Sequence, residues 1–249
     1  MPRRLKFTIS YDGTEYHGWQ KQPGLATIQG SIEEVLSQIE GDRVDVVGSG
    51  RTDAGVHALA QVAAATLHNP IPTVNLRKAM NRLLARDIRI LDVREAAAGF
   101  HPRFHAVAKT YEYRIYREEI CPPFERRYVY HHPYPLDEQA FRTAASLYEG
   151  THDFTAFAAA DEKDALGAAK VRTIFSSTAE REGTRLVYRV RGSGFLKHMV
   201  RNLVGGLLEA GKGNLTMGEL AALLENPNRR KLGHSAPASG LFLVGVEYE

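Results

Sequence analysis

The sequence predicts an α/β fold made of two tandem ferredoxin-like (βαββαβ) units. Each half of the chain carries the same order of periodic segments: strand, helix, strand, strand, helix, strand. That order is characteristic of the split βαβ unit. An alanine-rich stretch at residues 96–108 separates the two halves. We therefore expect one half at residues 1–100 and the other at residues 101–249, related by pseudo-symmetry.

In the first half, two helices alternate with four strands. Thr27 can cap a helix that Gly41 ends, because the apolar residues between them fall at helical spacing. A second helix starts after Thr73, and its expected inward residues are Leu76, Met80, Leu83 and Leu84. The expected strands are residues 5–11, 44–47, 60–67 and 88–93.

The second half repeats this order with one further helix. Thr216 and Glu219 form a capping box at the start of that helix, and Glu182-Gly183 is the turn of an expected hairpin. The other expected helices are residues 136–147 and 196–210, the latter stopped at Gly211. The expected strands are residues 109–116, 171–179, 185–191 and 241–248.

Composition is that of a soluble globular protein, with 43% hydrophobic and 24% charged residues in a chain of 249. No apolar run approaches the roughly 18 residues of a membrane span, and the N-terminus lacks the apolar core of a signal peptide. We therefore expect the protein in the cytoplasm.

The one cysteine, Cys121, excludes an internal disulfide, and the Cys and His spacing does not favour a zinc site. A net charge of +3 permits an anionic partner without requiring one.

A glycine-rich loop at residues 48–57 is the first candidate site. It lies between two expected strands and holds Arg51 and Asp53 two positions apart. Glycines let a large ligand approach the backbone closely, and charged residues on such loops are often catalytic. The alternative is structural: Asp53 caps the turn, and Arg51 is solvated.

A second basic cluster stands where a helix follows Gly192-Ser193-Gly194. Lys197 and Arg201 are four residues apart and are expected to share one helix face. Cations at a helix N-terminus oppose the helix dipole, which suggests a role in meeting a phosphate or a carboxylate. The alternative is a solvated basic face.

Aromatic residues beside cations are a third feature, because RNA bases stack on rings while phosphates pair with Arg or Lys. Tyr111, Tyr113 and Tyr116 alternate along an expected strand that also carries Arg114 and Arg117. Ordinary packing of the tyrosines is the alternative. The RNP signature of an RRM is absent from the sequence, which argues against a simple module for single-stranded RNA.

Five segments, taken in order, resemble the motifs of the bacterial tRNA pseudouridine synthase A family. They are residues 11–20 (YDGTEYHGWQ), 50–57 (GRTDAGVH), 109–113 (KTYEY), 195–202 (FLKHMVRN) and 236–243 (APASGLFL). The set spans nearly the whole chain and is far more specific than any one segment. The resemblance implies a pseudo-symmetric pseudouridine synthase fold, with the active-site cleft between its two halves.

The resemblance also implies roles for the matched residues. Asp53 matches the catalytic aspartate of the family, Arg51 the arginine two positions before it, and Arg201 the basic residue that pairs with the aspartate. The residues expected to bind the substrate are Tyr111, which matches the tyrosine that stacks on the target base, together with Lys197 and His198. The implied activity is isomerisation of uridine to pseudouridine at positions 38 to 40 of the tRNA anticodon arm, by a homodimer without cofactor or metal.

The reaction accounts for these residue types. The N1–C1′ bond breaks, the uracil turns, and the base rejoins C1′ through C5. A carboxylate can attack or stabilise C1′, or act on the base, and the residue pattern does not choose among these. A nearby guanidinium favours the ionised carboxylate, and an aromatic face can hold a base that has left its stack.

Two other functions stay open. A non-catalytic RNA-binding protein would need the cations and rings but not Asp53. A nucleoside or glycoside hydrolase would need a second carboxylate, for which Asp12 and Glu15 are the candidates. The cations expected to meet RNA phosphates are Arg3, Arg4, Lys6, Lys21, Arg77, Lys78, Lys197 and the run Arg229-Arg230-Lys231.

Overall fold

The computed structural model describes residues 1–160, 169–225 and 234–249. These residues form two compact units. The first unit joins Met1–Val107 to Phe242–Glu249, and the second is Ala108–Leu241. Compared with the predicted halves, the division falls later in the chain, and the closing strand is grouped with the first unit.

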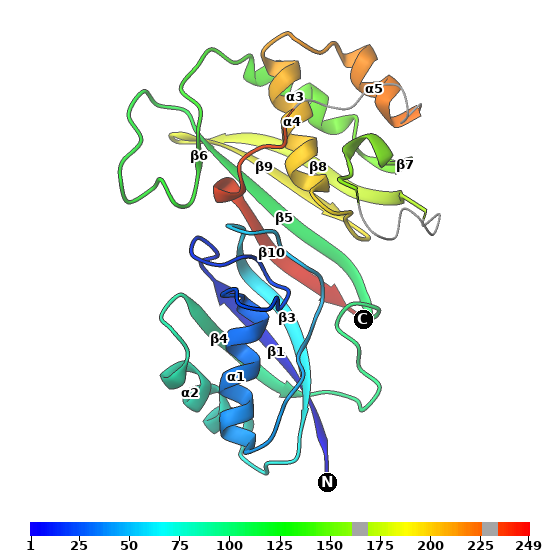
Figure 1. Ribbon diagram of the computed structural model, residues 1–249. Coiled ribbons are helices and arrows are strands. Elements are labelled where there is room, and N and C mark those ends of the chain that lie inside the picture. Colours follow the sequence, from blue (N-terminus) through cyan, green and yellow to red (C-terminus); the bar gives the residue numbers. More distant parts are fainter. Residues whose placement is uncertain (161–168, 226–233) are drawn as a thin grey trace. The chain divides into compact units, whose positions relative to one another are not determined.

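The first unit has the βαββαβ order of a ferredoxin-like fold (Figure 1). Its strands run in the order β4-β1-β3, each antiparallel to its neighbour, and β2 also pairs with β3. Figure 1 shows α1 and α2 beside each other against these strands. The elements are β1 (Arg3–Tyr11), α1 (Ile28–Glu40), β2 (Val47–Gly48), β3 (His57–Leu67), α2 (Thr73–Leu83) and β4 (Ile88–Glu95).

The closing strand β10 (Leu241–Tyr248) runs parallel to β3. It pairs with His57 and Ala58 at the start of β3, whereas β2 pairs further along with Ala63 and Ala64. Because β2 is only two residues long, the start of β3 stays available to β10. This pairing explains why the last residues belong to the first unit.

The first helix is capped as predicted. The Thr27 side chain accepts the N–H of Gly30, and Gly41 ends the helix with a φ of 81°. The expected strand at residues 44–47 is wrong except at Val47, because α1 side chains take its backbone donors. The N–H of Val44 donates to Ser37 Oγ, and that of Val46 donates to Glu33 Oε1.

One expected core position of the second helix is also wrong. Leu76 and Met80 are fully buried, but Leu83 is 45% exposed. The helix ends at Leu83, and the extended backbone of Leu84 turns that side chain inward in its place.

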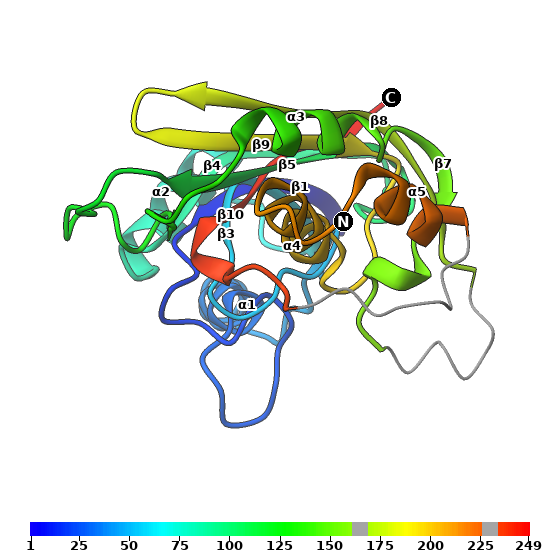
Figure 2. The same ribbon diagram turned by 90° about the horizontal axis from the view of Figure 1, so that it is seen from above.

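The second unit contains the strand order β5-β9-β8-β7, and β6 also pairs with β5. The predicted hairpin is confirmed, with Gly183 in the turn at a φ of 58°. Seen from above, α3 and α4 lie on the same side of that hairpin (Figure 2). The elements are β5 (Ala106–Tyr116), β6 (Tyr130–His131), α3 (Glu138–Ser146), β7 (Gly150–Asp153), β8 (Val171–Glu182), β9 (Arg185–Gly192), α4 (Met199–Gly211) and α5 (Met217–Glu225).

The last helix of the second unit begins with the predicted capping box. Thr216 Oγ1 accepts the N–H of Glu219, and the Glu219 carboxylate accepts the N–H of Thr216.

The βαββαβ order of the first unit occurs again later in the chain, in β5, α3, β8, β9, α4 and β10. The predicted fold class is therefore confirmed. None of the helices in the described residues has the length and apolar character needed to span a membrane.

Candidate active site

The glycine-rich loop is anchored to β3 by hydrogen bonds to Gln61. Ser49 Oγ donates to Gln61 Oε1 at 2.6 Å, and Gln61 Nε2 donates to the carbonyl of Gly50 at 3.1 Å. Both Ser49 and Gln61 are fully buried. This buried polar pair fixes the loop immediately before Arg51 and Asp53.

The segment 11–20 holds the other end of the loop by close backbone approach. The N–H of Trp19 donates to the carbonyl of Thr52 at 3.0 Å, and that of Gly55 donates to the carbonyl of Tyr16 at 3.3 Å. A Cβ on Gly18 would lie 2.5 Å from Thr52 O, and a Cβ on Gly13 would overlap Val56 O. Glycine is therefore required at both positions, because the two segments touch through their backbones.

A buried tyrosine completes this first cluster. Tyr11 Oη and Thr52 Oγ1 are 2.8 Å apart and share a hydrogen bond next to Asp53. Burial raises the pKa of Tyr11 to about 12. Tyr11 was not among the predicted site residues, although the segment that contains it was.

Asp53 and Arg51 lie on this anchored loop. Asp53 is half-buried and its carbonyl accepts the N–H of Val56, so its backbone closes the turn. Arg51 is exposed, and its Nε donates to Gln20 Oε1 at 3.1 Å. The loop thus holds a carboxylate and a guanidinium near solvent, and the pairing of Asp53 with Arg201 stays a prediction.

The candidate substrate-binding tyrosine lies on β5 in the second unit. Tyr111 is 8% exposed, and its ring meets that of Phe195 edge-on, with the ring centroids 5.0 Å apart. Phe195, which sequence reasoning did not single out, is half-buried and belongs to the segment that leads into α4. The two rings form one aromatic wall.

The start of α4 differs from the prediction. The helix begins at Met199, with His198 as its N-cap, so Lys197 precedes the helix and does not share a helix face with Arg201. The reason lies in His198, whose φ of 59° is left-handed and cannot continue a right-handed helix backward. Within residues 1–160, 169–225 and 234–249, it is the only non-glycine residue with a positive φ.

Arg201 is joined to the segment that precedes β10. Its Nε donates to the carbonyl of Ala236 at 2.7 Å, and the N–H of Ala236 donates back to the carbonyl of Arg201 at 3.1 Å. Asn202 adds a bond from Nδ2 to the carbonyl of Phe157 at 2.7 Å. These bonds fix the first turn of α4 and the direction of the Arg201 side chain.

The segment 236–243 also packs against β5. Tyr113 Oη donates to the carbonyl of Pro237 at 2.8 Å, and a Cβ on Gly240 would lie 2.8 Å from the Tyr113 ring. Burial is the main cause that raises the pKa of Tyr113 well above its ordinary value. The five motif segments therefore gather into two clusters, one in each unit.

Comparison with known proteins identifies the family. A family model described as "tRNA pseudouridine synthase" matches residues 8–105 and 144–249. The protein named "tRNA pseudouridine synthase A" from Solibacter usitatus (strain Ellin6076) is 63% identical over 99% of this chain and 100% of its own length. The chain belongs to the tRNA pseudouridine synthase family. Two further relatives of the same name are those of Acetivibrio thermocellus, 41% identical over 99% of this chain and all of its own, and Geobacillus sp. (strain WCH70), 43% identical over the full length of both.

In this tRNA pseudouridine synthase family member, the tyrosines of β5 form no exposed platform. Tyr113 is fully buried and Tyr116 nearly so. Arg114 Nε donates to Glu112 at 2.7 Å, and Arg117 Nε donates to Glu138 at 3.2 Å. Packing therefore explains Tyr113 and Tyr116, and the neighbouring Arg114 and Arg117 are held by carboxylates.

The candidate second carboxylate Asp12 is engaged by its own turn and by His57, whose Nδ1 lies 3.1 Å from Asp12 Oδ1. Its Oδ1 accepts the N–H of Thr14 at 2.9 Å and the Thr14 hydroxyl at 2.6 Å. This turn geometry favours a structural role for Asp12 and gives no support to the hydrolase alternative. Among the described residues, no group of three or more His, Cys, Asp or Glu side chains is arranged to hold a metal ion.

The cations expected to meet RNA differ in how they are held. Arg3 pairs with Glu95 and Lys21 with Glu33, and Arg4 Nε donates to the carbonyl of Phe100. Lys6 Nζ lies over the Tyr248 ring, 4.0 Å from its centroid. Arg77 and Lys78 line a pocket, and Lys197 is exposed. The run 229–231 lies outside the described residues.

Proposed function

We propose that this protein isomerises uridine to pseudouridine in tRNA, in the cytoplasm, at positions 38 to 40 of the anticodon arm. The observation that carries the proposal is the family match along both units, together with the anchored loop that presents Asp53. The anticodon positions and the compartment rest on the resemblance and on the composition, respectively.

In this mechanism, Asp53 supplies the catalytic carboxylate. The N1–C1′ bond of the uridine breaks, C5 of the uracil forms the new bond to C1′, N1 gains a proton and C5 loses one. Atoms therefore balance without an added reactant. The Arg51 guanidinium, two positions away on the same loop, helps to place the carboxylate.

The resemblance also assigns roles to residues of the second unit. The resemblance assigns Arg201 to pair with the catalytic aspartate. Within its own unit, Arg201 Nε donates to the carbonyl of Ala236, and the Arg201 carbonyl accepts the N–H of Ala236, so the start of α4 is held in place. Tyr111 stacks on the uracil that has left the helix, with Phe195 as its supporting ring. Lys197 and His198 contact the RNA beside the target nucleotide.

The decisive experiment measures tritium release from C5-labelled uridine in tRNA by the wild type and by Asp53→Asn. Asparagine keeps the size and turn geometry but removes the charge, so tritium release should fall to background while tRNA affinity stays within about tenfold, or ~1.4 kcal/mol. Asp42→Asn is the matched control, because Asp42 is an exposed turn residue whose carboxylate accepts the N–H of Arg43. That control should keep full activity.

Each alternative function predicts another result. A non-catalytic RNA-binding protein releases no tritium as wild type, and a hydrolase yields free uracil instead of pseudouridine. Substantial release by Asp53→Asn would reject Asp53 as the catalytic group. A large fall in the melting temperature of that variant would instead assign the aspartate to the turn.

We also propose a homodimer, because the resemblance implies that a partner subunit completes each active site and a tRNA arm is large beside a chain of 27.7 kDa. Light scattering at working concentration should give twice that mass. A monomer mass with full activity would remove the dimer from the proposal.

A further inference from the structure

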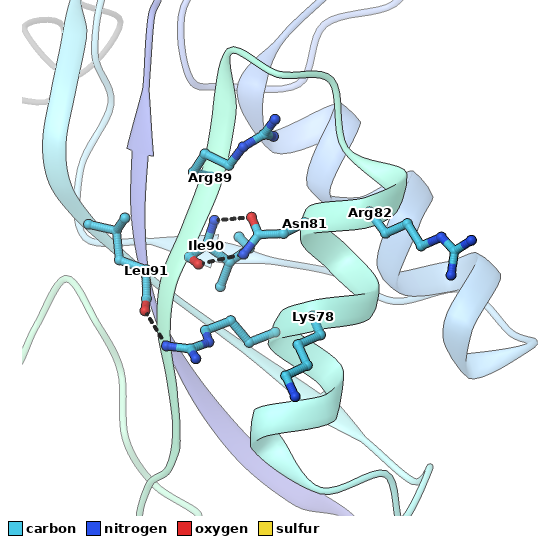
Figure 3. A pocket seen from close by; sticks show the side chains of 7 residues that line it. Lys78, Asn81, Arg82, Arg89, Ile90 and Leu91 are labelled. Carbon is cyan, nitrogen blue, oxygen red and sulfur yellow. Dashed lines mark hydrogen bonds between the residues drawn. The ribbon is translucent and has the colours of Figure 1, made fainter.

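Between α2 and β4 of the first unit lies an open pocket of about 640 Å³. Figure 3 shows that helix residues form one wall and strand residues the other. The lining residues are Arg77, Lys78, Asn81, Arg82, Arg89, Ile90 and Leu91. Four of these seven side chains are cations, and none is a carboxylate.

The pocket is not a place where another strand can add to the sheet. β4 ends the strand order of its unit, but α2 side chains occupy its backbone groups. Asn81 Nδ2 donates to Ile90 O and its Oδ1 accepts the N–H of Ile90, both at 2.8 Å (Figure 3). Arg77 also donates to Leu91 O at 3.1 Å. These bonds protect the edge from strand pairing.

Positive charge is concentrated around this pocket. From residue 77 to residue 89, the chain has five cations and one carboxylate, so the local net charge is +4, against +3 for the whole chain. The single carboxylate, Asp87, accepts the Tyr16 hydroxyl at 2.9 Å. Within the described part of the chain, no carboxylate forms an ion pair with Lys78 or Arg82.

Lys78 and Arg82 are the cations best placed to meet a ligand. They lie four residues apart on α2, and both are exposed. Asn81 points toward β4 in Figure 3, whereas Arg82 leaves the helix on the side away from that strand. Their charges are therefore presented to solvent, while Arg77 and Asn81 secure the helix to the strand beneath.

We propose that Lys78 and Arg82, the exposed cations of α2 at the rim of this pocket, bind phosphates of the tRNA backbone. Two exposed cations one helical turn apart suit the repeated charges of a phosphodiester chain, and contacts of this kind position RNA without reading bases. This inference rests on the proposed function, because it takes tRNA as the ligand.

The test compares the wild type with Lys78→Gln/Arg82→Gln in tRNA binding as a function of salt. Removing two phosphate contacts should lower the slope of log K against log salt by roughly 1 to 2 and weaken binding about tenfold at low salt. The kcat at saturating tRNA should not change. Glutamine is a good helix former, so the melting temperature should also be preserved.

Two further variants make the result specific. Lys78→Arg/Arg82→Lys keeps both charges and should retain the wild-type slope. Arg43→Gln/Arg142→Gln removes two cations that are paired with Asp45 and Glu138, and it should also leave the slope unchanged. If this control lowers the slope equally, net charge and not the pocket accounts for the effect, and the proposal is overturned.

Failure of this inference can be told apart from failure of the proposed function. If the wild type releases tritium, and if Lys78→Gln/Arg82→Gln has the same slope of log K against log salt as the wild type, only the phosphate-binding proposal is overturned. A wild type that neither binds tRNA nor releases tritium overturns both. An unchanged slope would leave an acidic protein partner as the remaining class of ligand for this surface.

Discussion

The two motif clusters differ in what holds the segment that carries their proposed charged residue. In the first unit, the Asp53 loop is held by backbone contacts, with Gly13 and Gly18 pressed against Val56 and Thr52. In the second unit, the start of α4 is held by side chains that bond to carbonyl groups, such as Arg201 to Ala236. The difference teaches that the Asp53 loop tolerates no added Cβ at Gly13 or Gly18, in addition to its Ser49–Gln61 hydrogen bonds, whereas the direction of Arg201 depends on one side-chain hydrogen bond.

The largest effect is expected from adding one carbon to the first cluster. In Gly13→Ala, the new Cβ would overlap the backbone carbonyl of Val56, which cannot move without displacing the loop. We expect a loss of about 3 kcal/mol or more in the free energy of unfolding, together with loss of activity. Thermal unfolding and tritium release would measure both.

Gly99→Ala is the control for this change, because nothing lies within 4 Å of a Cβ at that position and its φ is not left-handed. Its stability should stay within about 0.5 kcal/mol of the wild type. A Gly13→Ala variant as stable as Gly99→Ala would show that the two segments do not touch as described.

The second effect concerns the buried tyrosine beside the same loop. The pKa of Tyr11 in the folded protein, about 12, lies above the ordinary value of 10.0. The stability that the buried, protonated Tyr11 contributes is therefore fully present below pH 10 and is lost as the pH rises toward 12. At pH 11 the wild type should have lost about 1.4 kcal/mol more than Tyr11→Phe, relative to pH 9. Urea unfolding at the two pH values measures this difference.

The exposed Tyr134 provides the control for the alkaline experiment. Tyr134→Phe should lose stability between pH 9 and pH 11 as steeply as the wild type does. Equal slopes for the wild type and Tyr11→Phe would mean that Tyr11 is not buried in solution.

The third effect tests the side-chain attachment of the second cluster. Arg201→Lys keeps the charge but loses the Nε bond to Ala236, so the charge is no longer directed. We expect kcat to fall about tenfold or more while tRNA affinity changes little. Single-turnover tritium release separates the two quantities.

Arg181→Lys is the matched control, since Arg181 Nε donates to Gly183 O at the same 2.7 Å in the same unit. It should cost at most about 1 kcal/mol of stability, and kcat should stay at the wild-type value. Equal losses of kcat in both variants would reduce Arg201 to a structural residue.

Sequence patterns were sufficient where local chemistry decides the structure. The Thr27 and Gly41 caps, the Thr216-Glu219 capping box and the βαββαβ order were all confirmed. These features depend on residues within one turn or on simple periodicity. The order of the motif segments was also enough to predict the family.

Other features were not predictable because distant residues decide them. The expected strand at 44–47 failed because Ser37 and Glu33 compete for its backbone donors. The helix expected from Leu196 begins instead at Met199, because His198 takes a left-handed backbone that no periodicity reveals. Phe195 became a site candidate only when the Tyr111 ring was found against it.

The smallest expected effect comes from a variant that separates the backbone strain at His198 from the RNA contact proposed for its side chain. A left-handed φ costs a non-glycine residue of the order of 1 kcal/mol, but glycine also gains entropy when the chain unfolds. For His198→Gly these two terms nearly cancel, so stability should stay within about 0.5 kcal/mol of the wild type. If the imidazole contacts RNA as proposed, tRNA affinity should still fall about threefold to fivefold in a filter-binding assay.

Gly183 supplies the reverse experiment in the same unit, because its φ of 58° nearly equals the 59° of His198 and nothing lies within 4 Å of a Cβ there. Gly183→His should therefore lose up to about 1 kcal/mol of stability with no change in tRNA affinity, which measures the cost of a histidine in this conformation away from the proposed site. Together, the two variants separate strain from binding. If His198→Gly gains a full 1 kcal/mol and binds tRNA as the wild type does, the histidine carries strain without contacting the substrate, and its proposed role fails.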